Sequence, residues 1–106
     1  MKRLILLAAL LAGLHAVARA QDKALEAVCG ELLGARQTAI RMRDGGFPMQ
    51  VTLNETLGRP EWRNAPMQYQ SLAVRVVQEV YFAPGQQESE IVRETCRRAI
   101  DAPKAG

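Results

Sequence analysis

The segment MQYQSLAVRVVQEVYFA, residues 67–83, decides the fold class. Its β-branched residues and the alternation at its start are features of a strand. The sequence offers no second strand-like segment to pair with it, and an isolated strand leaves its backbone groups unsatisfied. As a helix it is apolar on two sides, formed by Tyr69, Leu72, Val76 and Val80 and by Val74, Val77 and Tyr81. Because such a helix is typical of a bundle centre, we predict a central helix and an all-α fold.

The residues before this segment predict a short helix followed by a connector. Pro48 suits the first turn of a helix, and Gly58 is expected to end it. The buried edge of this helix is expected to contain Met49, Leu53 and Leu57. Residues 59–66, RPEWRNAP, contain two prolines and predict a connector, in which Trp62 closes an edge of the core.

Longer amphipathic helices are expected on both sides of this region. The first runs from about Asp22, its N-cap, to Asp44, and Gly45-Gly46 ends it. Its apolar stripe contains Leu25, Val28, Cys29, Leu32, Leu33, Ala39 and Ile40. After a turn at Pro84-Gly85, the last helix runs from about Glu88 to Asp101, with inward-facing Ile91, Val92, Cys96, Ala99 and Ile100. We therefore predict a bundle of about four helices, followed by a polar tail at residues 101–106.

Residues 1–20 have the three-part layout of a secretory signal peptide. A basic start, Met1-Lys2-Arg3, precedes the mostly apolar residues 4–17 and the small-x-small sequence Ala18-Arg19-Ala20. The apolar run is shorter than the ~20 residues that a membrane-spanning helix needs, which argues against an uncut anchor. We expect cleavage after Ala20, a periplasmic location without stable membrane insertion, and a single helical domain at residues 21–106.

Removal of this segment changes the charge and the chemistry of the chain. Residues 1–20 hold three of the 14 lysines and arginines, leaving 11 basic against 11 acidic side chains, and they hold the single histidine, His15. A neutral domain gives no support for nucleic-acid binding. Without histidine it cannot build a Ser-His-Asp or Cys-His site or a His-ligated metal centre. A carboxylate-pair hydrolase stays open by residue type, but we expect no enzyme, no metal and no cofactor.

Cys29 and Cys96 are the two cysteines of the chain, and both fall on the apolar stripes of their helices. In an oxidising compartment a disulfide between them is expected. Two free buried thiols, or half of a metal site, are the alternatives. A bond between the first and last helices would stabilise a core that is small for independent folding.

Two short motifs lie between these cysteines. The first is RDGGFPM, residues 43–49, and the second is VYFAP, residues 80–84. Their order resembles a family of small secreted helical proteins of Gram-negative bacteria and their phages, with the pattern Cys, Arg-x-x-Gly-x-Pro-Met, Tyr-x-x-Pro, Cys. The resemblance covers most of residues 29–96. It implies a helical fold and an envelope location, and it implies no activity or catalytic residue.

Arg36 is the first candidate contact residue, because it lies inside the apolar stripe of the first helix, where an unpaired charge is costly. In one interpretation its stem packs at the edge while its guanidinium reaches water. In a second it forms an ion pair with Glu79 or Glu88. In a third it binds an anionic ligand or a carboxylate of a partner protein.

The turn at residues 43–49 and a set of large side chains are the other candidates. Backbone N–H groups at the start of the second helix attract anions, although a helix connector explains the same residues. Exposed members of the large set would form a partner groove, although most are expected in the core. The set comprises Phe47, Met49, Trp62, Met67, Tyr69, Tyr81 and Phe82. The candidate contact residues are therefore Arg36, Arg43, Phe47 and Met49.

These features predict a non-enzymatic binding or accessory protein that acts on another protein of the cell envelope. The alternative is a small-ligand carrier with an anionic ligand near Arg36.

Overall fold

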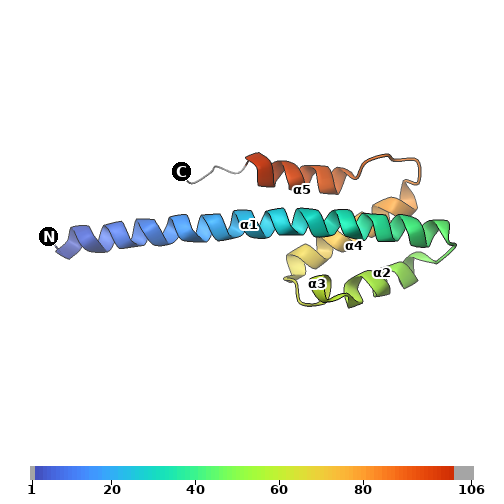
Figure 1. Cartoon of the computed structure of the whole chain (residues 1–106), viewed down its shortest axis with the longest axis horizontal. Coiled ribbons are helices and arrows are strands. Elements are labelled where there is room, and N and C mark those ends of the chain that lie inside the picture. The colour runs from blue at the N-terminus through green and yellow to red at the C-terminus, as the bar shows by residue number, and fades with distance from the viewer. Residues whose placement is uncertain (1, 102–106) are drawn as a thin grey trace.

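The computed structural model describes the backbone of residues 2–101 and the side chains of residues 23–98. This part of the chain forms five helices and no strand (Figure 1). They are α1 (Lys2–Asp44), α2 (Met49–Gly58), α3 (Pro60–Arg63), α4 (Met67–Phe82) and α5 (Glu90–Asp101). The all-α prediction is confirmed. The helix beyond the expected four is the single turn α3, which lies inside the predicted connector and begins at a proline, a residue preorganised for a first helical turn.

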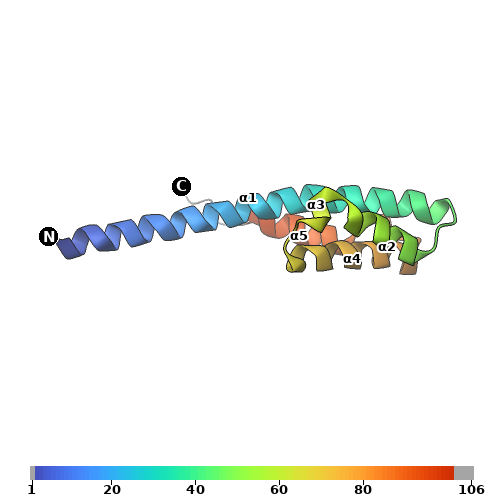
Figure 2. The same cartoon turned by 90° about the horizontal axis from the view of Figure 1, so that it is seen from below.

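α1 is longer than predicted at its N-terminal end. It continues through Asp22 to Lys2, so the prediction of an N-cap at Asp22 is wrong for this chain. Leucine and alanine dominate residues 4–17 and favour helix, and nothing in that run interrupts it. The N-terminal part of α1 projects past the end of the bundle in both views (Figures 1 and 2).

α4 lies at the centre of the bundle, as its two apolar sides predict. It contacts each of the other four helices, and Ala73, Val76, Val77 and Val80 are buried. α1 packs against α2, α4 and α5. Figure 2 shows these shorter helices mostly on one side of α1.

The core consists of two neighbouring clusters. The larger one contains Trp62, which is almost fully buried, so its predicted place in the core is confirmed. Its other buried members are Val28, Leu32, Ala35, Ala73, Val76 and Val92. The smaller cluster has Ala39, Val77 and Val80 at its centre, with Met49 and Leu53 packed against it.

Two details of the predicted core are wrong. Leu33 is 47% exposed, because it follows Leu32 by about 100° around α1 and so lies beyond the packed face. In α2 the most buried residues are Thr52 and Thr56, whereas Met49, Leu53 and Leu57 are only partly buried. The small threonine side chains face the core one turn apart, a position that apolar periodicity does not reveal.

α5 is joined to α1 by the predicted disulfide. Cys29 and Cys96 are bonded, with a Cα–Cα distance of 5.4 Å and a sequence separation of 67. α5 begins at Glu90, two residues later than predicted, because Ser89 caps it by accepting a hydrogen bond from the backbone N–H of Val92 at 3.1 Å. The side chains of Ala99 and Ile100, and residues 102–106 of the expected tail, lie outside the described residues.

Candidate functional site

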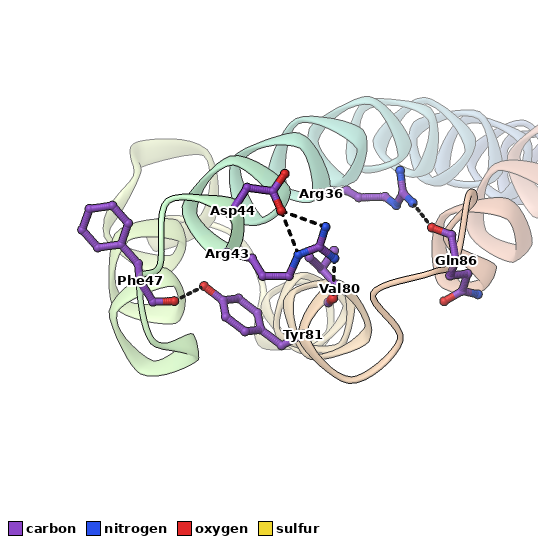
Figure 3. A network of polar contacts seen from close by, with 7 residues as sticks. All are labelled: Arg36, Arg43, Asp44, Phe47, Val80, Tyr81 and Gln86. Atoms are coloured by element: carbon purple, nitrogen blue, oxygen red, sulfur yellow. Dashed lines mark hydrogen bonds and ion pairs between the residues drawn. The ribbon is translucent and has the colours of Figure 1, made fainter.

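The two sequence motifs meet in the structure (Figure 3). Arg43, near the end of α1, donates through Nη1 to the carbonyl oxygen of Val80 at 2.9 Å. Tyr81 donates its hydroxyl hydrogen to the carbonyl oxygen of Phe47 at 2.7 Å. These hydrogen bonds join the turn after α1 to the last turn of α4. The RDGGFPM and VYFAP segments are therefore the two halves of one structural junction.

The Tyr81 hydroxyl also holds α2 in place. Its oxygen lies 2.6 Å from Oγ1 of Thr52, which is fully buried. Because the single hydroxyl hydrogen of Tyr81 points to Phe47, Thr52 is the donor of this second bond. The Tyr81 hydroxyl is thus the hydrogen-bond partner of both the buried Thr52 hydroxyl and the Phe47 carbonyl.

The turn at residues 45–47 uses its own N–H groups to end α1. Gly46 donates to Arg43 at 3.0 Å and Phe47 donates to Met42 at 2.9 Å. This pair of bonds, with a φ of 85° at Gly46, is a Schellman motif. Gly45 donates to Arg41 at 2.9 Å. These donors are paired inside the chain, so the glycines of the turn offer no N–H group to an anion.

Arg36 makes a bond that none of its three interpretations included. Its Nη2 donates to the carbonyl oxygen of Gln86, in the α4–α5 turn, at 3.1 Å (Figure 3). Within the described residues it forms no ion pair with Glu79 or Glu88, so the direct pairing hypothesis is wrong. Arg36 and Arg43 instead hold two successive parts of the chain, the end of α4 and the turn that follows it.

Glu79 completes this junction, and sequence reasoning assigned it only as a partner for Arg36. Its Oε2 accepts the backbone N–H of Glu90 at 3.1 Å, at the positive end of the α5 dipole. Its Oε1 is buried without a hydrogen-bond partner among the described residues. It lines a small cavity of about 30 Å³ together with Arg36 and Arg43. A space of this size accommodates one or two water molecules.

The remaining candidate side chains divide between core and surface. Met49 packs partly buried against the smaller core cluster. Phe47 and Phe82 are 50% and 75% exposed, and Val51 is also exposed. The Tyr81–Phe47 hydrogen bond holds the turn that contains Phe47 against the last turn of α4, which contains Phe82. The Phe47 ring points away from Tyr81 (Figure 3). We call Phe47, Val51 and Phe82 the aromatic end.

Tyr81→Phe is expected to lower the free energy of unfolding by about 1–3 kcal/mol, because it removes both hydrogen bonds of the hydroxyl and leaves the buried Thr52 hydroxyl unpaired. Urea denaturation followed by tryptophan fluorescence measures the change. Tyr69→Phe is the matched control, since no hydrogen bond of the Tyr69 hydroxyl is present within the described residues. Equal stability of the two variants would contradict a structural role for the Tyr81 hydroxyl.

No family model, curated protein or solved structure matches this chain. Among the described residues, no helix combines the length and apolar character needed to cross a membrane. The same part of the chain contains no group of three or more His, Cys, Asp or Glu side chains arranged to hold a metal ion.

Proposed function

We propose that this chain is a non-enzymatic binding protein of the cell envelope that contacts another envelope protein through its aromatic end. The observation that carries the proposal is the exposure of the phenylalanine rings at Phe47 and Phe82. Exposed aromatic side chains are typical of protein–protein contact surfaces.

The fold makes this surface rigid. Phe47 accepts the Tyr81 hydrogen bond through its carbonyl and donates to α1 through its N–H, so its backbone is held on both sides. Phe82 belongs to the last turn of α4, where Arg43 binds the carbonyl of Val80. Rigid anchors lose little conformational entropy when a partner binds, which favours affinity.

Export is part of the same proposal, with residues 1–20 acting as a signal peptide that is cut after Ala20. The first buried core residue is Val28, and the helix before it projects beyond the bundle (Figure 1). Cleavage there would leave the described core whole. A disulfide between Cys29 and Cys96 fits an oxidising compartment such as the periplasm.

The small-ligand alternative is less well supported. The cavity beside Arg36 measures about 30 Å³, which is the size of one or two waters rather than of an organic anion. It also contains the Glu79 carboxylate, which repels anions. An enzymatic role has little support either, because residues 21–106 contain no histidine to serve as a base.

Native mass spectrometry of the protein released gently from the periplasm of its host tests the proposal. We expect a stoichiometric complex with a second protein, and a denatured mass that corresponds to cleavage after Ala20 and to one disulfide. A double variant, Phe47→Ser with Phe82→Ser, is expected to weaken the isolated complex by at least about tenfold, the loss typical of interface hot spots.

Met67→Ser is the matched control, because Met67 is 79% exposed at the opposite end of α4. It is expected to leave the complex intact. A complex that resists the double variant, or one that the control weakens equally, would show that the aromatic end is not the contact surface. The absence of any protein complex under native envelope conditions would overturn the binding function itself.

A further inference from the structure

Two glycines in the middle of α1 have no role in packing the described part of the chain. Gly30 and Gly34 lie one turn apart and are exposed, and a Cβ atom added at either would meet nothing within 4 Å. Glycine inside a helix is less stable than alanine. Small residues at this spacing do, however, let the backbone of a second helix approach closely. Their presence therefore points to contact with another chain.

A pocket beside Gly34 gives an independent indication of an occupant. It measures about 40 Å³ and lies between α1 and the α2–α3 segment, with Gly34, Thr56 and Trp62 among its lining residues. Oγ1 of Thr56 is buried without a hydrogen-bond partner among the described residues, and the residue is only 2% exposed. Buried hydroxyls are nearly always paired. A helix lying over Gly34 would cover this pocket.

The uncovered face of α1 has an ordered pattern of side chains. At about 100° per residue, Gly30 and Gln37 form its centre line, directly opposite the packed side. One edge carries, in order along the helix, Lys23, Gly34 and Arg41, and the other carries Glu26, Leu33 and Asp44. All eight residues are exposed. One edge is thus basic around a glycine, and the other is acidic around a leucine.

We propose that this face of α1 pairs with the same face of a second copy of the chain, with the two helices parallel. A two-fold axis along the helices brings each edge against the opposite edge of the other copy. Lys23 of one copy then faces Glu26 of the other, and in the same way Leu33 faces Gly34 and Arg41 faces Asp44. The two residues of each pair differ in height along the helix axis by at most about 4.5 Å. In an antiparallel pair, the basic edge of one chain would instead face the basic edge of the other, and the two acidic edges would also face each other, so that like charges meet.

Lys23 and Glu26 belong to none of the ion pairs between described residues. Arg41 donates one hydrogen bond, to Oγ1 of Thr38 at 3.4 Å, and Asp44 binds Arg43 through Oδ1. The other N–H groups of Arg41 and Oδ2 of Asp44 therefore remain for a second copy. The face from Lys23 to Asp44 is about 32 Å long. A single helix face of this length buries less area than a standard stable interface. The dimer is therefore weak and depends on protein concentration.

Sedimentation equilibrium of the oxidised protein as isolated from its host tests the proposal. We expect a monomer–dimer equilibrium that weakens as salt is added, because exposed charge pairs are screened. Gly34→Leu is expected to weaken the dimer by at least about tenfold by filling the space that Leu33 of the second copy occupies. Arg75→Leu, on the exposed side of α4, is the matched control and is expected to leave it unchanged. A monomer at all concentrations, or equal effects of the two variants, would overturn the proposal.

Charge reversal and cross-linking test the orientation. Glu26→Lys is expected to weaken the dimer, and adding Lys23→Glu to it is expected to restore dimerisation. Gln37→Cys, on the centre line, is expected to form a covalent dimer under mild oxidation, whereas Arg75→Cys is not. A double variant as weak as the single one, or a dimer that Gln37→Cys fails to cross-link, would exclude the parallel pairing. Phe47 and Phe82 are not among the eight residues of this face, and their substitutions are expected to leave this equilibrium unchanged, so the two proposals fail independently.

Discussion

Replacing both Cys29 and Cys96 by alanine is expected to lower the free energy of unfolding by about 4 kcal/mol. The bond joins residues that are 67 positions apart in the sequence, and breaking it returns the conformational freedom of the loop between them to the unfolded chain. Small domains have a total stability of roughly 5–15 kcal/mol. Loss of the bond therefore removes a large part of the stability of this domain.

Urea denaturation at constant temperature, followed by far-UV circular dichroism, measures this effect. The reduced native sequence is the matched control, because it lacks the bond but keeps the sulfur atoms where Cys29 and Cys96 pack. We expect the reduced protein and the double alanine variant to unfold at similarly low urea concentrations. If the reduced protein were as stable as the oxidised one, the helices alone would hold the domain together and the disulfide would contribute little.

The helices and the disulfide were predictable because both depend on regular patterns in the sequence. The two apolar sides of residues 67–83 predict the central position of α4, and the structure confirms it. Cysteines on the stripes of the first and last helices predict the bond. The burial of Thr52 and Thr56 was not predicted, because the pattern of apolar residues in an amphipathic helix assigns threonines to its exposed side. Only the partner of the Thr52 hydroxyl, Tyr81, explains its burial.

The junction between the motifs was beyond sequence reasoning for a related reason. Arg36 and Arg43 bind backbone carbonyls of Gln86 and Val80. Every residue has a carbonyl, so no residue type marks the partner in advance. A search for charged partners therefore pointed Arg36 to Glu79, which instead accepts the backbone N–H of Glu90. The motif order was the one useful signal, since the two segments that it singles out are the ones that meet.

Trp62→Ala is expected to lower the free energy of unfolding by about 3–5 kcal/mol, the usual range when a buried large aromatic side chain is removed. Trp62 is among the largest fully buried side chains of the described residues, and it packs in the cluster that joins α1, α4 and α5. Because α3 is a single turn, too short to form a stable helix alone, its position depends on this side chain. We expect the α2–α4 connection to loosen when the indole is lost.

Far-UV circular dichroism in urea is the appropriate measurement, because Trp62 is the single tryptophan and the variant has no tryptophan fluorescence. Met67→Ala, which shortens a side chain that is 79% exposed, is the matched control and is expected to stay within about 0.5 kcal/mol of the native protein. Trp62→Phe is expected to fall between the two, since a smaller ring fills part of the space. If Trp62→Ala were no more destabilising than Met67→Ala, the larger core cluster would not depend on the indole, and α3 would be held by its backbone connections alone.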